Sequence, residues 1–337
     1  MTATAFSAMS QGRVDPELLA RISDEVAIVE EELLLQVRSQ VDLVEKVGRH
    51  TLEAGGKRLR PAFVTLAAQA TNLEFSIERT RKLGACMEMI HMATLIHDDV
   101  IDNAVTRRGR STASAEFGNT AAILSGDVLL SKAMVLLSRD GDLDIIRSVS
   151  EAAVDIAEGE VRELGVRGIF DLDEATHLDV LGLKTASFIE CCCEVGAIVA
   201  GAPEEIQRAL KAFGYHVGMA FQIVDDILDY RGDQSKTGKP IATDFREGQA
   251  TLPLIFLRDC LSEAESTMAR RKFGNGVNED EIRMISDWMD TRGAFDLAEQ
   301  AAKAHITQAI LTLDKLPDSP SKALLETVAY HIIRRQS

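Results

Sequence analysis

Apolar side chains recur along most of this chain at intervals of three and four residues. The stretches with this helical spacing are about Glu17 to Glu53, then 76–102, 119–139, 142–164, 173–200 and 204–230, and finally Leu254 to the end. Such spacing is typical of helices that bury one face. Stretches that alternate apolar and polar residues, as strands do, are few. The pattern predicts an all-α protein that folds as a single large helical bundle.

Turn residues mark the breaks between the predicted helices. Gly55 and Gly56 interrupt the first stretch, and Pro61 can open the helix that follows. The segment "RGDQSKTGKPIATDFREGQATLP" is about twenty residues long, and such a loop inside a compact domain is usually a functional lid or disordered. Residues 1–14 are small and polar and lack the apolar core of a signal peptide. We therefore expect a disordered tail over 1–14 and a single all-helical domain over 15–337.

The composition excludes several classes of protein. A net charge of −16 argues against a nucleic-acid binder, which normally carries a basic face. Three of the five cysteines are consecutive and no CxxC spacing occurs, so the chain indicates a reduced, cytoplasmic protein without a zinc site. The longest apolar stretch, "AAILSGDVLLSKAMVLL", is interrupted by Asp127 and Lys132, so no transmembrane segment is expected. A loose membrane association stays open.

Two groups of aspartates are set among apolar residues. "LIHDDVID" carries Asp98, Asp99 and Asp102, and "FQIVDDILDY" repeats the arrangement with Asp225, Asp226 and Asp229. On a helix the first and last member of each group lie on one face, with the middle one about 100° round. Like charges at this spacing are unfavourable, and desolvating them costs more unless a cation compensates. One such group is commonly a solvated acidic face, but two in apolar surroundings favour a metal site.

Carboxylate ligands without a thiolate suit hard cations such as Mg²⁺, with Mn²⁺ as a substitute. Because Mg²⁺ usually binds through few carboxylates plus substrate phosphates, two acidic groups facing one cavity could hold a diphosphate through shared ions. A di-iron bundle is the competing metal site, since Glu88 and His91, and Glu174 and His177, both have its Glu-x-x-His spacing. That chemistry leaves the basic residues described next without a role.

Two short basic clusters accompany the acidic groups. "GGKRLRP" supplies Lys57, Arg58 and Arg60 at a glycine turn, and "TRRGR" supplies three arginines just beyond Asp102. Guanidinium groups bind phosphate in a bidentate manner, and ammonium groups act as point charges. A solvated basic loop is the plainer interpretation of one such cluster. The link to the aspartate helix favours a second diphosphate pocket beside the metal site, which Lys236 and Lys239 of the long loop could close over.

At this point the residues resemble a known family, the trans-prenyl diphosphate synthases. The resemblance runs from about residue 40 to the end of the chain. It is carried, in order, by "GGKRLRP", "EMIHMATLIHDDVID", "RRG", "FGNTAAILSGD", "KTASF", "FQIVDDILDY" and "GKPIATDFREGQATLPL". It implies an isoprenoid synthase fold with a deep central cavity, and an active homodimer in the cytoplasm. It also implies that two or three Mg²⁺ ions and two substrates, isopentenyl diphosphate and an allylic diphosphate, bind to it.

The resemblance also implies a role for each matching residue. Isopentenyl diphosphate would be bound by Lys57, Arg60, His91 and Arg108. Mg²⁺ would be held by Asp98, Asp102 and Asp225, with Asp99, Asp226 and Asp229 in support. The allylic diphosphate would contact Arg107, Lys184 and Lys239. Thr185 and Gln222 would lie near the developing carbocation. No Ser/His/Asp or Cys/His nucleophile is found, and this chemistry needs none, because cations stabilise the leaving group. The chain departs from the family pattern at Ala242, where glycine is frequent, and at Gln249, where lysine is common.

Product length is predicted from side-chain size before the first acidic group. Thr94 and Ala93 precede Asp98 by four and five residues, which on a helix is about 6–7.5 Å. Short-chain members of the family have bulky aromatics there, whereas this chain has small side chains followed by the adaptable Met89. Met134 is expected on the opposite wall. The sequence therefore predicts octaprenyl-class products, with decaprenyl as the near neighbour, made for a quinone side chain. The alternatives are a shorter-chain, geranylgeranyl-type synthase, a terpene cyclase and a non-catalytic partner subunit.

Overall fold

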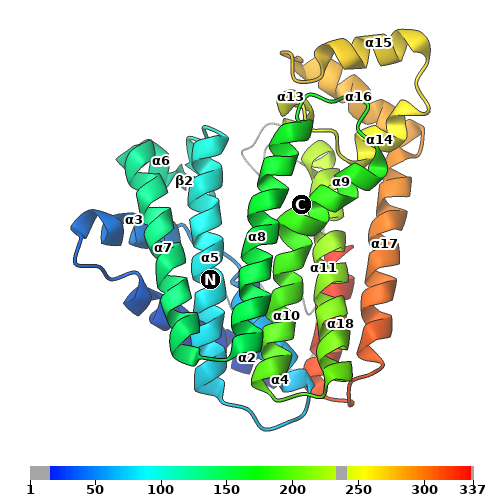
Figure 1. The fold of residues 1–337 in the computed structure, drawn as a ribbon. Helices are drawn as coiled ribbons and strands as arrows, with labels where there is room; N and C mark the ends of the chain where they lie inside the picture. The colour runs from blue at the N-terminus through cyan, green and yellow to red at the C-terminus, as the bar shows by residue number, and fades with distance from the viewer. Residues whose placement is uncertain (1–15, 233–240, 335–337) are drawn as a thin grey trace. The chain divides into compact units, whose positions relative to one another are not determined.

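The computed structural model describes residues 16–232 and 241–334, and helices dominate these residues (Figure 1). The first half of the described chain forms α2 (Pro16–Gln36), α3 (Asp42–Glu53), α4 (Leu59–Ala70), α5 (Ile77–Ile101), β1 (Thr106–Arg107), β2 (Arg110–Ser111), α6 (Ala113–Phe117), α7 (Asn119–Asp140) and α8 (Leu143–Val166). The second half forms α9 (Glu174–Leu181), the π-helix η1 (Gly182–Ala186), α10 (Ser187–Val199), α11 (Glu204–Arg231), α13 (Thr243–Glu247), α14 (Leu252–Arg258), α15 (Glu263–Lys272), α16 (Glu279–Thr291), α17 (Ala294–Leu313) and α18 (Pro320–Ile332). The predicted all-α class is confirmed. The predicted tail, residues 1–14, lies outside the described residues.

The chain groups into two compact units, which are described separately. Unit 1 comprises Met1–Ser150, Cys191–Lys211 and Lys315–Thr327. Unit 2 comprises Glu151–Glu190, Ala212–Asp314 and Val328–Ser337. Helices α8, α10, α11 and α18 contribute residues to both. The single domain over 15–337 stays a prediction.

In unit 1, α5 packs against α2, α4 and α7, and Figure 1 shows α5 and α7 side by side. The helix begins where the Ser76 hydroxyl accepts the backbone N–H of Arg79, a cap that satisfies an otherwise orphan donor. The α5–α7 contact depends on Gly126, because a Cβ there would lie 2.4 Å from Nε2 of His97. His97 directly precedes the first aspartate, so this close approach fixes the end of α5 that carries the acidic group.

Helix α7 is the one described helix that is long and apolar enough to cross a membrane. Length and composition alone are weak grounds for a span, since the core helix of a packed bundle meets the same criteria. Here α7 packs against α3, α5 and α6. The Lys132 ammonium donates to the backbone carbonyls of Gln36, at 2.7 Å, and Arg38, which caps the C-terminal end of α2.

In unit 2, α14 packs against α9, α16 and α17. Next to it, a cluster of aromatic rings anchors the short helix α13. Phe245 is fully buried, and its ring centroid lies 5.4 Å from that of Phe273, which in turn lies 5.5 Å from Phe170. The Gly168 N–H donates to the Gly248 carbonyl at 2.7 Å, so the backbone after α13 is tied as well. The described part of the expected lid is therefore an anchored element.

Some element boundaries differ from the prediction for local reasons. The stretch from Glu17 to Glu53 is two helices, separated over 37–41. The stretch 173–200 is interrupted by the π-helix η1. A π-turn has one residue more than an α-helical turn, and this changes the apolar spacing too little for the sequence to reveal it. The loop after the first acidic group contains a minimal β-hairpin, in which Thr106 pairs with Ser111. All five cysteines are free in this structure and four of them are buried.

Candidate active site

The first acidic group lies at the C-terminal end of α5, in unit 1. Asp98 is half-buried, Asp99 is 5% exposed and Asp102, the residue that caps the helix, is exposed. Arg107 donates from Nε to Oδ1 of Asp99 at 2.7 Å. Asp99 therefore holds a predicted diphosphate ligand in place. Asp98 and Asp102, one turn apart, remain the members of this group best placed to meet a cation.

Arg58 is part of the core and not of the phosphate cluster that the sequence suggested. It is 4% exposed and donates to Glu88 Oε1 at 2.9 Å, to Glu30 Oε1 at 3.0 Å and to the Leu52 carbonyl at 2.9 Å. A buried arginine needs such partners because desolvating its charge is costly. This network fixes the glycine turn from which Lys57 and Arg60 extend.

The two basic clusters come together at Gly56. A Cβ at this position would lie 2.8 Å from Nη1 of Arg108 and 3.2 Å from Nη1 of Arg58, so both guanidinium groups approach the backbone of this glycine closely. Burial lowers the pKa of Arg60, and Glu88 and Asp98 oppose the shift. Lys57 is exposed at the same turn. Unit 1 thus gathers the residues predicted to bind isopentenyl diphosphate.

His91 lies among these arginines, where its neutral form is favoured. Burial lowers its pKa well below the usual range, and the charges of Arg60, Arg108, Arg107 and Arg58 lower it further. A neutral imidazole can donate one hydrogen bond without adding to the positive charge. The site therefore combines a cationic cluster with a neutral donor.

The residues predicted to set product length belong to unit 1. Met89 and Ala93 are buried on α5, Thr94 donates from Oγ1 to the His91 carbonyl at 2.9 Å, and Met134 is half-buried on α7. Because α5 packs on α7, the two helices can share one wall-forming surface. That these side chains line a product tunnel stays a prediction.

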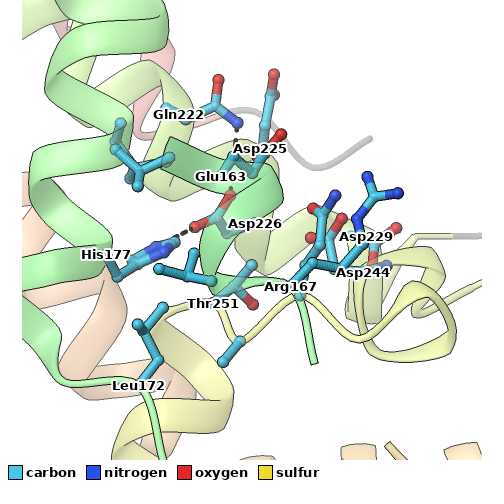
Figure 2. Close-up of a pocket in the computed structure, with 15 residues that line it drawn as sticks. Glu163, Arg167, Leu172, His177, Gln222, Asp225, Asp226, Asp229, Asp244 and Thr251 are labelled. Atoms are coloured by element: carbon cyan, nitrogen blue, oxygen red, sulfur yellow. Dashed lines mark hydrogen bonds and ion pairs between the residues drawn. The ribbon is translucent and has the colours of Figure 1, made fainter. Parts of the chain in front are cut away.

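The second acidic group opens onto a pocket of about 210 Å³ in unit 2 (Figure 2). It is lined by Glu163, Val166, Arg167, Leu172, His177, Val180, Leu181, Gln222, Asp225, Asp226, Asp229, Asp244, Gln249, Ala250 and Thr251. The pocket therefore has carboxylates along one part of its wall and apolar side chains along another.

Helices α9 and α11 and the π-helix η1 supply a chain of hydrogen bonds that reaches this pocket. Thr185 donates from Oγ1 to Oε1 of Gln222 at 3.2 Å, so the two residues predicted to meet the carbocation do lie together. The Gln222 amide is 3.5 Å from Oδ1 of Asp226, and His177 Nε2 is 3.0 Å from the other oxygen of that carboxylate.

Lys184, the neighbour of Thr185 in η1, binds Glu160 at 2.7 Å and Glu163 at 2.5 Å. Burial lowers the pKa of Lys184, but these carboxylates outweigh it and the net shift is upward.

The carboxylates of this pocket repel one another. Burial raises the pKa of Asp229 to about 6, and the nearby negative charge of Asp226 also raises it. Hydrogen bonds from the backbone of Asp244 and Thr243 act in the opposite direction and lower it. Burial also raises the pKa of Asp244 well above its usual value, with Asp229 and Asp226 adding to it. Figure 2 shows Asp229 and Asp244 close together beside Arg167. Such crowded oxygen ligands fit a hard divalent cation, which would relieve the repulsion.

The alternative di-iron site does not fit. Glu88 is bound to Arg58, and His177 is bound to Asp226. Within residues 16–232 and 241–334, no group of three or more His, Cys, Asp or Glu side chains forms a ready-made metal cluster. Mg²⁺ usually binds through few carboxylates plus substrate phosphates, so such an ion does not need a ready-made protein cluster.

The pocket also contains residues that the sequence analysis gave no role at this site. They are Glu163, Arg167, His177 and Asp244. Asp244 lies within the expected lid, in "IATDFREG", and could have been found as a further buried acid. The other three come from α8, α9 and the intervening loop; no local pattern marks Glu163 or Arg167, and His177 stood out only as half of the Glu-x-x-His spacing. Lys236 and Lys239, predicted to close over the site, lie outside the described residues.

Comparisons with known proteins show which family the chain is similar to. Residues 41–288 match the family model described as Polyprenyl synthetase. The chain is 35% identical to heptaprenyl diphosphate synthase component 2 of Geobacillus stearothermophilus, over 93% of this chain and 97% of that protein. It is 34% identical to octaprenyl diphosphate synthase of Escherichia coli (strain K12), over 93% and 96%. The crystal structure of a decaprenyl diphosphate synthase from Rhodobacter capsulatus matches with a TM-score of 0.89 and 32% identity, covering 98% of this chain and 99% of that one.

Proposed function

The chain belongs to the polyprenyl synthetase family, and from this premise we propose that it condenses successive isopentenyl diphosphate units onto an allylic diphosphate. The expected starter is farnesyl diphosphate. The expected product is a long-chain, all-trans polyprenyl diphosphate of the octaprenyl to decaprenyl class.

The observation that carries the proposal is the cationic cluster of unit 1. Arg108 lies over Gly56 beside the turn that carries Lys57 and Arg60, and His91 is held neutral among them. This cluster can bind a diphosphate without using the aspartates of the same unit. A reaction with one diphosphate substrate, such as terpene cyclisation, has no use for it. A reaction with two diphosphate substrates needs both the cationic cluster and the aspartates.

The other residues act on the allylic substrate. Arg107 and Lys184 bind its diphosphate, and the anchored positions of both side chains reduce the entropy lost on binding. Asp98, Asp102 and Asp225 would hold two or three Mg²⁺ ions, with Mn²⁺ as a substitute, and these would supply positive charge that stabilises the departing diphosphate. The Thr185 and Gln222 oxygens, which lie 3.2 Å apart, would stabilise positive charge on the allyl carbon. The isopentenyl double bond attacks that carbon, and the released diphosphate accepts the proton.

We further propose a cytoplasmic homodimer that associates loosely with a membrane to release its product, which serves as a quinone side chain. Support for these points comes from the family resemblance, the acidic net charge of −16 and the hydrophobic nature of the product.

A direct test is release of diphosphate by the purified chain, with and without isopentenyl diphosphate. We expect release from farnesyl diphosphate to require both isopentenyl diphosphate and Mg²⁺, to stop with a chelator and to return when Mg²⁺ is restored. Release without isopentenyl diphosphate would indicate a cyclase. A chain that is inert by itself would be a partner subunit.

A further inference from the structure

His177 and Asp226 form a buried pair at the base of the pocket in unit 2. The side chain of His177 is 7% exposed and that of Asp226 is 4% exposed, and Nε2 lies 3.0 Å from Oδ2 (Figure 2). An ionised carboxylate only accepts hydrogen bonds, so Nε2 is the donor. Since a buried carboxylate that loses its donor suffers the full penalty of desolvation, this contact is a strong constraint on where Asp226 points.

The second oxygen of Asp226 determines how Gln222 is oriented. The amide nitrogen of Gln222 faces Oδ1 of Asp226 at 3.5 Å, the outer limit of a hydrogen bond. Because the carboxylate cannot donate, the NH₂ end of the amide must face it, and the carbonyl end is left for the Thr185 hydroxyl at 3.2 Å. A rotation of Asp226 would therefore release Gln222 and, through it, Thr185.

Unit 1 has a parallel contact. There Asp99, the middle aspartate of the first acidic group, accepts a hydrogen bond from Arg107 at 2.7 Å. In both groups the middle aspartate is buried and tied to a protein donor, while the first member, Asp98 or Asp225, is half-buried. The two acidic groups thus place their middle member by the same means and with different donors.

We propose that His177 is a positioning residue of the second acidic group. By fixing the Asp226 carboxylate it orients Gln222 and Thr185 and leaves Asp225 as the group's metal-facing carboxylate. His177 itself touches neither metal nor substrate. The proposal rests on the proposed prenyltransferase function, and it assigns to α9 a role in binding metal and diphosphate in unit 2.

The test compares His177→Gln with His177→Phe. The glutamine amide nitrogen can reach the place of Nε2 and donate to Asp226, whereas phenylalanine fills similar volume without a donor. The first readout is Mn²⁺ binding in the presence of inorganic diphosphate, followed by the electron paramagnetic resonance signal of free Mn²⁺. We expect His177→Phe to weaken Mn²⁺ binding by about tenfold or more, since a hydrogen bond to a charged group is lost. His177→Gln should recover most of it.

Steady-state kinetics give the second readout. His177→Phe should lower kcat by about tenfold or more and change the KM for isopentenyl diphosphate less than about twofold, because the residues for that substrate belong to unit 1. In an Asp226→Asn background the same substitution should add little, because His177 acts through Asp226. His216→Phe is the matched control: His216 is on α11, the helix that carries Asp226, is paired with His305 at 3.0 Å and does not line the pocket, so the variant should behave as wild type.

The outcomes separate the two proposals. Wild-type Mn²⁺ binding in His177→Phe, or a glutamine variant no better than the phenylalanine one, would overturn the role of His177. If His177→Phe does not fold, His177→Asn replaces it, because its shorter amide stops short of Asp226. A wild-type chain that binds Mn²⁺ with diphosphate but never consumes isopentenyl diphosphate would overturn the proposed function and leave the positioning role standing.

Discussion

Arg58 and Arg60 are two residues apart in one short motif, and the structure gives them different tasks. The Arg58 side chain is 3% exposed and is paired with Glu88, whose side chain is also 3% exposed. Arg60 extends from the same turn toward the cationic cluster with His91. One arginine holds the turn, and the other is expected to bind substrate.

Arg58→Ala should therefore lower the free energy of unfolding by about 3–5 kcal/mol, because it leaves a buried Glu88 charge without its partner. Arg60→Ala should instead raise the KM for isopentenyl diphosphate about tenfold or more while the KM for the allylic substrate changes little. Urea denaturation measures the first effect and initial rates measure the second. Equal stability of the Arg58→Ala variant and wild type, or a shift in the allylic KM for Arg60→Ala, would contradict this division.

Asp98 and Asp225, the first members of the two acidic groups, are expected to be essential for turnover and not for folding. Asp98→Ala or Asp225→Ala should reduce kcat by orders of magnitude, because each removes a proposed Mg²⁺ ligand. The fold should persist, since removing a carboxylate from a crowded acidic group relieves repulsion. Circular dichroism and Mg²⁺-dependent turnover measure the two effects. Near-normal turnover in either variant would remove that residue from the metal site.

At the scale of elements, α13 shows why the departure from the family pattern at Ala242 matters. Ala242 has φ 55° and ψ 45°, a left-handed conformation that favours glycine, and it is fully buried. Its N–H donates to the Asp229 carbonyl at 2.7 Å. The strain therefore lies in the backbone that ties α13 to the second acidic group.

Ala242→Gly should keep the free energy of unfolding within about 1 kcal/mol of wild type, because relief of strain offsets a lost methyl group and a more flexible unfolded chain. Ala242→Val should lower it by roughly 2 kcal/mol or more, since a branched side chain is poorly tolerated in this conformation. Thermal denaturation followed by circular dichroism gives the order. If valine is tolerated as well as glycine, the left-handed conformation is not a constraint.

Helix α5 carries the prediction on product length. Ala93 is 2% exposed and lies one turn and a residue before Asp98. If this face lines the product tunnel, Ala93→Phe should shift the products to about C15–C20 while the first condensation continues. Chromatography of the dephosphorylated products measures the shift. An unchanged distribution would mean that Ala93 does not line the tunnel.

The sequence predicted α5, α7 and α11 well because their apolar spacing is long and uninterrupted. It missed η1, since one π-turn changes the spacing by a single residue. It also assigned Arg58 to the phosphate cluster, because its partners Glu30 and Glu88 are 28 and 30 residues away. His177 was visible only as half of a metal motif. Its contact with Asp226 spans 49 residues, and no local pattern contains such a pairing.

At the scale of the whole molecule, local clusters of basic residues occur in a chain whose net charge is strongly negative. The net charge of −16 makes the basic residues around Gly56 the exception, and it places phosphate-binding groups where the surrounding field is negative. Divalent cations suit such a protein, because they balance both the aspartates and the substrate. The molecule is thus expected to depend on Mg²⁺ for binding as well as for turnover.

The central claim is that this chain elongates an allylic diphosphate to a long polyprenyl product. It is tested most directly by incubating the purified chain with farnesyl diphosphate, labelled isopentenyl diphosphate and Mg²⁺, and by reading product length by chromatography. We predict mainly octaprenyl products, with decaprenyl as the neighbouring species. Products that stop at about C20, or no incorporation of label at all, would contradict the account.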